Sequence, residues 1–210
     1  MIFLKRRAVF LTAFLLAHIC VASFAHAEPR KDPRKDFIVA LDEQNIRDFL
    51  REVSEISTGQ RPDLLDDDLI DYFANHIAEK GEFKSSIRYQ IPGFPTQDSE
   101  MVLAREEYIN SVINGRFLME DYKAEIDIQD LKIAGNGKSA TFKSVTKEKG
   151  RMPMAKDEEK KQIEMIPIQG ESTCEQRLIV SFNNFIQMAK AECTTLVSFD
   201  PFAGKPLVPQ

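Results

Sequence analysis

The spacing of apolar residues changes at Gly115, and this change limits the folds open to the chain more than any other feature. Before Gly115, apolar side chains recur three or four residues apart, as on one face of a helix. After it they alternate, with Tyr122, Ala124 and Ile126 separated by charged residues, which is typical of a half-buried strand. Helices followed by antiparallel strands predict one α+β domain over residues 39–200.

Three helices and a short strand are predicted in the first half of the chain. Asp42 can cap the first helix, and Gly81 is a natural stop for the second. A strand over Phe83–Ile91 is expected between the second and third helices. The helices are expected over Leu41–Ile56, from residue 63 or 64 to Lys80, and from a Ser99 cap to Asn114.

The second half begins with a bent strand. Residues 122–133 alternate, but the apolar phase slips by one residue near Gln129–Asp130, as a β-bulge would cause. A turn at Gly135-Asn136-Gly137 leads to a partner strand over Ser139–Lys147. Residues 148–171 then break the pattern with charged runs, two prolines and three methionines. We expect an exposed connection there, mobile over Lys149–Lys161, in which only Gln162–Ile168 has the composition of a strand.

The last structured segment predicts a hairpin closed by a disulfide. Strands over Ser172–Phe182 and Phe185–Phe199 flank Asn183-Asn184. A hairpin centred on these asparagines places Cys174 directly opposite Cys193, on the same face. A four-residue loop would make them a non-hydrogen-bonded pair, and we favour it over the two-residue alternative. The bridge would add about 3 kcal/mol in the chain-entropy model.

The first 27 residues have the layout of a cleavable export signal. Lys5, Arg6 and Arg7 precede an uncharged apolar stretch, Ala8–Phe24, and Ala25-His26-Ala27 has the small-x-small pattern of a cleavage site. We therefore expect a periplasmic or secreted protein, cleaved near Ala27. The alternative is an uncut membrane anchor, since 17 residues is at the short limit for spanning a bilayer. Residues 28–38 are expected to form a flexible leader and 201–210 a tail.

Charge and ligand-forming residues exclude several function classes. The net charge is −5 with the signal and −8 without its three basic residues, so nucleic acid is not an expected partner, and a membrane is expected only if the signal stays uncut. After cleavage only His76, Cys174 and Cys193 remain as His or Cys ligands, fewer than the four of a structural zinc site. We expect neither a metal nor a cofactor.

The element order resembles the nuclear transport factor 2-like fold. Three helices with a short strand between the second and third, a bulged strand and a final hairpin carry this resemblance, without a sequence motif. It implies a bent antiparallel sheet wrapped around the N-terminal helices like a cone. The fold includes ketosteroid isomerase, scytalone dehydratase and polyketide cyclases, and also non-catalytic periplasmic domains of type IV secretion components, so it does not decide the function. Another α+β fold with helices on one face of the sheet is the alternative.

Two pairs of residues are weak site candidates. Tyr72 and His76 lie one helical turn apart on an apolar stripe and suit an acid–base pair at a pocket mouth, although a histidine satisfied within the core is the commoner outcome. Gln176 and Gln187 are polar exceptions on the apolar face expected for the last hairpin, and would contact a ligand in a mostly apolar pocket. Internal pairing of the glutamines is the alternative.

The sequence contains no nucleophile motif and no acidic cluster fit for a metal. We therefore expect an exported, non-catalytic binding or assembly module of a bacterial envelope, with an envelope protein or a small apolar ligand as partner. The alternative is a small-molecule-binding or lyase/isomerase-type enzyme that uses an apolar pocket in the cone, with Tyr72 and His76 at its mouth.

Overall fold

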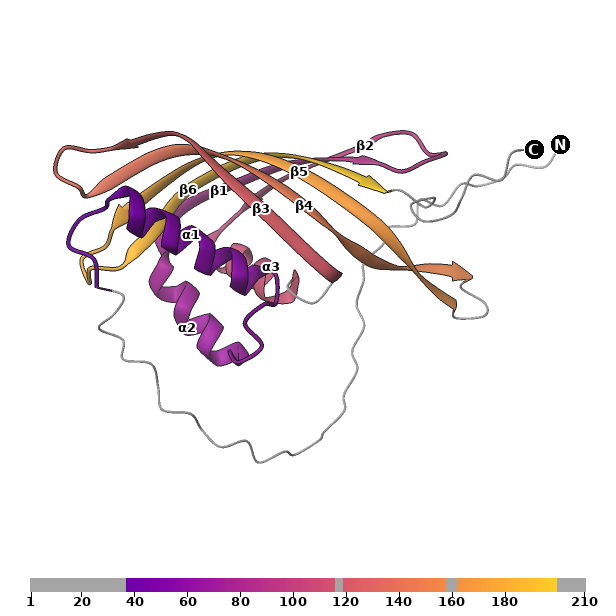
Figure 1. Cartoon of the computed structure of the whole chain (residues 1–210), viewed down its shortest axis with the longest axis horizontal. Helices are drawn as coiled ribbons and strands as arrows, with labels where there is room; N and C mark the ends of the chain where they lie inside the picture. The colour runs from indigo at the N-terminus through magenta and orange to yellow at the C-terminus, as the bar shows by residue number, and fades with distance from the viewer. Residues whose placement is uncertain (1–36, 116–118, 158–161, 200–210) are drawn as a thin grey trace, which may run out of the picture. The chain divides into compact units, whose positions relative to one another are not determined.

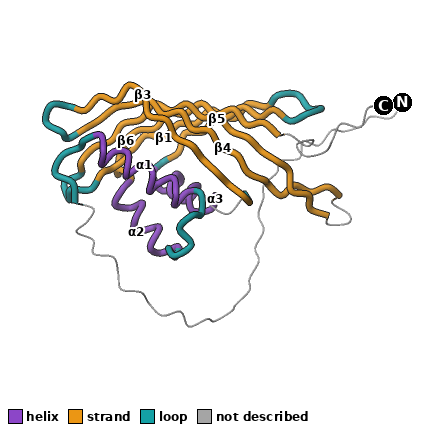
Figure 2. Tube along the Cα trace, in the orientation of Figure 1, coloured by secondary structure: helices purple, strands orange, loops and turns teal. Residues whose placement is uncertain are grey.

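The computed structural model describes residues 37–115, 119–157 and 162–199, without the side chains of 154–157 and 162. The described residues belong to one compact unit, Pro33–Gln210. They form an α+β fold with helices on one side of a mixed sheet (Figures 1 and 2). The elements are α1 (Glu43–Ser57), α2 (Asp66–His76), β1 (Ile77–Gln90), β2 (Gln97–Leu103), α3 (Arg105–Gly115), β3 (Glu120–Ile133), β4 (Ser139–Asp157), β5 (Gln162–Val180) and β6 (Ile186–Phe199). The predicted signal, leader and tail lie outside the described residues, apart from Phe37 and Ile38.

The six strands are ordered β2-β1-β6-β5-β4-β3. Strands joined by a turn are antiparallel, whereas β1 pairs with the last strand, β6, in parallel. The sheet is therefore mixed, and the wholly antiparallel sheet expected from the sequence is wrong at this one pairing. A parallel pair needs a long connection, and here everything from β2 to β5 provides it.

Helix α1 confirms the predicted start. The Asp42 carboxylate accepts the backbone N–H of Asn45 at 2.8 Å, and the Asn45 side chain accepts the N–H of Asp42 at 3.0 Å. This reciprocal capping satisfies two N–H groups that the first turn leaves without helical partners. The buried side chains of α1 are Ile46, Phe49, Leu50 and Ile56, at the helical spacing that the sequence predicted.

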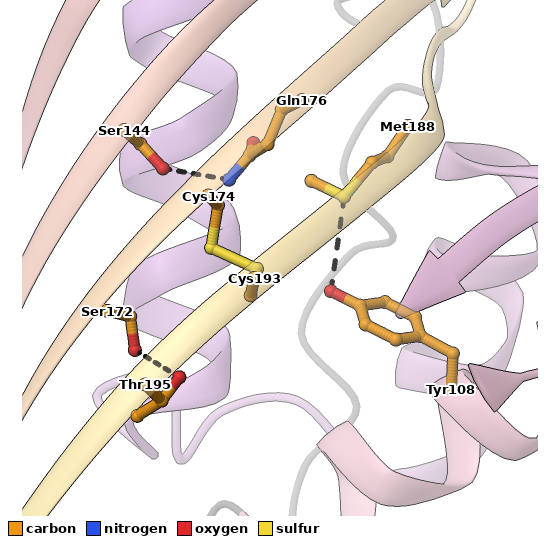
Figure 3. The surroundings of a disulfide bond; sticks show 8 residues. All are labelled: Tyr108, Ser144, Ser172, Cys174, Gln176, Met188, Cys193 and Thr195. Carbon is orange, nitrogen blue, oxygen red and sulfur yellow. Dashed lines mark hydrogen bonds between the residues drawn. A yellow bond between two sulfur atoms is a disulfide. The ribbon is translucent and has the colours of Figure 1, made fainter. Parts of the chain in front are cut away.

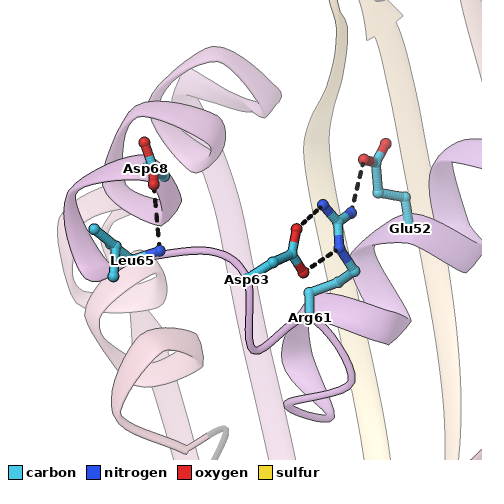
Figure 4. A network of polar contacts seen from close by, with 5 residues as sticks. All are labelled: Glu52, Arg61, Asp63, Leu65 and Asp68. Atoms are coloured by element: carbon cyan, nitrogen blue, oxygen red, sulfur yellow. Dashed lines mark hydrogen bonds and ion pairs between the residues drawn. The ribbon is translucent and has the colours of Figure 1, made fainter. Parts of the chain in front are cut away.

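The connection from α1 to α2 is fixed by charge pairs (Figure 4). Arg61 donates two hydrogen bonds to the Asp63 carboxylate, at 2.9 and 2.8 Å, and its guanidinium lies 3.7 Å from Glu52 of α1. At the start of α2 the Asp68 carboxylate accepts the N–H of Leu65 at 3.3 Å. Asp68 therefore caps the first turn of α2, where the acidic run Asp66–Asp68 also suits the helix dipole.

Helix α2 ends at His76, four residues before the predicted Lys80. The next residue, Ile77, is extended and pairs with Met188 of β6. Arg105 of α3 donates to the carbonyls of Ala74 and Ile77, at 2.7 and 3.1 Å, and so satisfies the helix end. Gly81 lies inside β1 instead of stopping a helix. A Cβ there would lie 2.6 Å from the ring of Phe83, so the close approach of this ring favours a glycine.

Strand β2 was not predicted, and Ser99 is not a helix cap. Ser99 lies in β2 opposite Ile87, and α3 starts only at Arg105. The Glu107 carboxylate accepts the N–H of Ala104 at 2.8 Å and serves as the cap. Because β2 is a mostly exposed edge strand, it has no alternating pattern that would reveal it.

Strands β3 and β4 confirm the predicted bulge and turn. Their register shifts between Gln129 and Lys132, and Asp130 has a φ of 52°. Gly137, with a φ of 66°, completes the turn. Glycine is needed here, because a Cβ would also lie 2.7 Å from that of Ala40.

The connection expected over residues 148–171 is wrong for 148–157 and 169–171, whereas the strand considered for Gln162–Ile168 is confirmed. Residues 148–157 continue β4 and 162–171 begin β5, and the two strands pair from Ser139↔Ile179 to Asp157↔Gln162. The pairing supplies backbone hydrogen bonds that the charged composition did not predict. The last four residues of the segment expected to be mobile, 158–161, lie outside the described residues.

The final hairpin confirms the predicted disulfide and corrects the faces near its turn. Cys174 and Cys193 are paired residues, bonded through sulfur, with Cα atoms 4.1 Å apart, close to the spacing of a non-hydrogen-bonded pair. Between Arg177 and Leu178 the register shifts by one, leaving Ala189 without an opposing residue. The bulge reverses the faces expected for β6 closer to the turn, so Ile186 and Met188 face the core, whereas β5 keeps its expected face with Leu178 buried.

One hydrophobic core joins the helices to the sheet. Side chains of α1, α2 and α3 and of strands β1, β4, β5 and β6 contribute to it, and the most buried include Ile46, Leu69, Phe73, Phe83 and Leu178. The core is concentrated toward the β5–β6 turn. Beyond it, the same face of the sheet carries mostly polar side chains.

Candidate functional site

The helix-facing surface of the sheet has two chemically different parts. Near the β5–β6 turn it is covered by core side chains of Phe142, Leu178, Ile186 and Met188, which we call the filled end. Farther along, the same surface carries a polar strip, which we define as Ser144, Thr146, Glu148, Ser172, Gln176 and Thr195, with Tyr122 beside Glu148. Ile126 and Ile128 of β3 line a hollow of about 340 Å³ together with residues of α1, so their side chains face the helices. Their strand partners, Thr146 and Ser144, lie on the same face, which places the strip toward the helices.

Tyr72 and His76 belong to the filled end and line none of the described hollows. Their rings lie 4.3 Å apart, and the His76 ring also contacts Phe49 and Phe185, at 5.4 and 5.5 Å. His76 is 6% exposed, and its Nδ1 lies 2.7 Å from the carbonyl oxygen of Ile186. Since a carbonyl only accepts, Nδ1 carries the proton. The packing fits a histidine satisfied within the core.

The two glutamines are not brought together. Gln187 lies between the buried Ile186 and Met188 and donates to the carbonyl of Asn75 at 2.9 Å. It therefore links the end of α2 to β6. The shared face expected for Gln176 and Gln187 is wrong, because the bulge at Ala189 shifts the alternation of β6.

Gln176 occupies the border between the filled end and the polar strip (Figure 3). Its Nε2 donates to the hydroxyl of Ser144 at 2.9 Å, and Ser144 is 2% exposed. The amide oxygen, Oε1, is inaccessible to solvent and has no hydrogen-bond partner among the described residues. A buried polar atom without a partner is costly and marks a place where a ligand donor would be stabilising.

The disulfide and a hydroxyl pair continue the strip. Ser172 and Thr195 share a hydrogen bond of 2.8 Å one row beyond Cys174 and Cys193 (Figure 3). On the other side of β6, the Tyr108 hydroxyl makes only a long contact, 4.0 Å, to the sulfur of Met188, and its ring stacks on Phe83. Burial raises the pKa of Tyr108, so this phenol stays protonated.

A tyrosine–carboxylate pair lies at the far end of the strip. Burial, followed by the charge of Glu148 and hydrogen bonding to it, raises the pKa of Tyr122. Glu148 pairs with Gly170, and its Oε2 lies 3.3 Å from where a Cβ of Gly170 would be. Gly170 therefore leaves room beside the carboxylate.

Sequence reasoning missed Glu148 because it assigned residue 148 to a connection. The available signal was the alternation of β4, which continues past Lys147: Ala140, Phe142, Ser144, Thr146 and Glu148 share one face. A charged residue at a position that continues a buried series is a recognisable exception.

The opposite face of the sheet has the charge pattern of a solvated surface. Lys147 lies between Glu125 and Glu171, and Lys143 pairs with Glu175. Cross-strand pairs of opposite charge contribute modestly and remain in water. A hollow of about 470 Å³ on this face is lined by such residues, with Glu148 and Gly170 at its border.

Within the described ranges, no three His, Cys, Asp or Glu side chains come close enough to hold a metal ion. None of the helices described has the length and apolar content needed to cross a bilayer.

Comparisons with known proteins find no family model and no curated protein that matches. Solved structures do match, including a scytalone dehydratase-like protein from Novosphingobium aromaticivorans (TM-score 0.48, 10% identity, 72% of this chain and 82% of that one). ActVI-ORFA from Streptomyces coelicolor matches with a TM-score of 0.40 and 16% identity, over 75% of this chain and 96% of that one. The hexachlorocyclohexane dehydrochlorinase LinA type 2 matches with a TM-score of 0.42 and 10% identity, over 79% of this chain and 95% of that one. Ketosteroid isomerase-like and NTF2-like proteins are also among them. At such identities and TM-scores these matches say nothing about the activity of this chain.

Proposed function

We propose that the chain is an exported, non-catalytic binding module that holds a small molecule on the polar strip of its sheet. The unpartnered Oε1 of Gln176, buried beside Ser144, carries this proposal. A core without function would have an apolar residue there, since a buried amide with one unused acceptor lowers stability.

The strip has the composition of a ligand surface. Half-buried hydroxyls of Ser172 and Thr195 and the pair of Tyr122 with Glu148 offer hydrogen-bonding groups, and apolar residues flank them. Such a mixture of apolar surface and few polar groups is what small-molecule sites use. Export is supported by the layout of residues 1–27 and by a disulfide, which persists in oxidising compartments.

A binding role has more support than the enzyme alternative built on Tyr72 and His76. An acid–base pair needs access to substrate, and both rings pack among Phe49, Phe73 and Phe185. An assembly role with an envelope protein stays a prediction, for which pull-down from the native envelope is the direct measurement.

The test is a screen of small molecules against purified protein, followed by thermal shift and NMR. We expect hits whose binding shifts resonances of Gln176, Ser172 and Thr195. The Gln176→Leu variant should lose those hits, whereas Gln169→Leu, on the opposite face of the same strand, should keep them. Hits that bind equally well to Gln176→Leu, or that shift only residues of the opposite face, would contradict the proposal.

A further inference from the structure

We propose that Glu148 is the charge-recognising group of this site, and that the ligand carries a protonated amine at one end and an apolar body. This inference rests on the proposed function and gives the ligand a chemical class. It follows from one row of the sheet, which is occupied by four residues on the helix-facing surface.

The row runs across four neighbouring strands. Glu148 of β4 pairs with Gly170 of β5, Gly170 pairs with Val197 of β6, and Val197 pairs with Tyr89 of β1. Adjacent strands are about 4.8 Å apart, so Glu148 and Tyr89 are roughly 14 Å apart along the row. Between them the floor is made of a glycine and a valine.

Glu148 has an unused capacity for a cation. Glu148 lies beside the Tyr122 phenol and makes no ion pair among the described residues. Arg151, three residues farther along β4, is already paired with Glu120 and Asp121, at 3.2 and 2.7 Å. A half-buried carboxylate without a counter-ion favours a cationic ligand group.

The lysines around this row do not supply the missing charge. Lys147 and Lys149 precede and follow Glu148 and project to the opposite face, where Lys147 lies between Glu125 and Glu171. Lys123 lies on that face too, next to Ala124, which is the partner of Glu148. The helix-facing side of the row is therefore acidic at one end and apolar beyond it.

Gly170 makes the carboxylate accessible along the row. A Cβ at this position would lie 3.3 Å from the Glu148 carboxylate and 3.7 Å from its Cβ. Any larger residue would occupy the space beside the carboxylate. An amine can enter this space, while its apolar body lies over Val197 and reaches toward Tyr89.

The experiment compares two probes of equal length by NMR titration at neutral pH and low salt: 4-phenylbutylamine and 4-phenylbutan-1-ol. We expect the amine to bind about tenfold more tightly or better, because a charge-assisted hydrogen bond is stronger than a neutral one. Glu148→Gln should remove the preference for the amine, and Gly170→Val should weaken the binding of both probes. Glu171→Gln, on the opposite face, should behave like the wild type.

The comparison of the amine with the alcohol on the wild-type protein can overturn the inference by itself. The test therefore does not depend on whether any variant folds. Equal affinity for amine and alcohol, or an amine preference that survives in Glu148→Gln, would overturn it. If the probes also shift Gln176, or the small-molecule screen still gives hits there, the proposed binding function stands while the amine class fails. Absence of binding by both probes overturns the inference, and the screen then decides the function separately.

Discussion

The filled end and the polar strip lie on the same face of the same strands, yet they are built on opposite principles. In the filled end, Leu178 is fully buried among apolar side chains, and His76 is hydrogen-bonded to backbone. In the polar strip, and counting only the described residues, Gln176 keeps an unused acceptor and Glu148 has no ion-pair partner. The difference teaches that the first part stabilises the fold, whereas the second gives up stability, which natural proteins do at functional sites.

The largest expected effect is on the filled end. Leu178→Ala should lower the free energy of unfolding by about 4 kcal/mol, through lost transfer energy and the cavity left behind. Leu196→Ala, a matched control on the exposed face of β6, should cost less than about 1 kcal/mol. Urea denaturation measures both. Similar costs for the two variants would remove the basis of the comparison.

The disulfide tests the border between the two parts. The double variant Cys174→Ala/Cys193→Ala opens a loop with a sequence separation of 19 and should lower the free energy of unfolding by about 3 kcal/mol. Mass spectrometry without reductant should first show that the wild-type protein lacks two hydrogens. Two free thiols in exported protein would contradict the bridge.

Alkaline pH tests the tyrosine buried over β1 and β6. Because the pKa of Tyr108 is raised in the folded state, its stabilising contribution is complete below the unfolded pKa near 10 and is lost as the pH rises above it. Above that pH, and below the folded-state pKa, the free energy of unfolding should fall by about 1.4 kcal/mol per pH unit for this one phenol. Tyr108→Phe should reduce that slope in denaturation curves between pH 9 and 11. An unchanged slope would show that Tyr108 ionises equally in both states.

The smallest effect is expected on the polar strip, and it has the opposite sign. Ser144→Ala/Gln176→Leu removes both members of a buried hydrogen bond and the unpartnered oxygen together, so the free energy of unfolding should stay equal or rise by about 1 kcal/mol. The same variant should no longer bind ligand. A loss of several kcal/mol would show that these polar groups support the fold.

Local patterns in the sequence predicted those elements whose cause is local. The Asp42 cap, the bulge at Asp130, the turn at Gly137 and the pairing of Cys174 with Cys193 depend on residues close to them, or on counting from a turn. The element order also led to the resemblance that recurs among the solved structures.

What the sequence did not predict depends on neighbours far along the chain. Helix α2 ends at His76 because Ile77 pairs with β6 and Arg105 satisfies the helix end. The long arms of β4 and β5 exist because each pairs with the other, which composition does not encode. Of the candidate site, only Gln176 was predicted. The bulge at Ala189 separated it from Gln187, and Glu148 was hidden in a segment expected to have no regular structure.

The parallel pairing of β1 with β6 has a consequence for how the chain must assemble. Gln90 and Ser198 are partners 108 residues apart, and β6 is the strand that joins β1 and β2 to the rest of the sheet. During synthesis, which starts at the N-terminus, the helices and the β1–β2 hairpin emerge before the strand that completes their part of the sheet. Closing the sheet is therefore a late, high-contact-order event. A chain cut short before residue 186 loses the middle of its sheet, not an edge, and should be a chaperone or protease substrate.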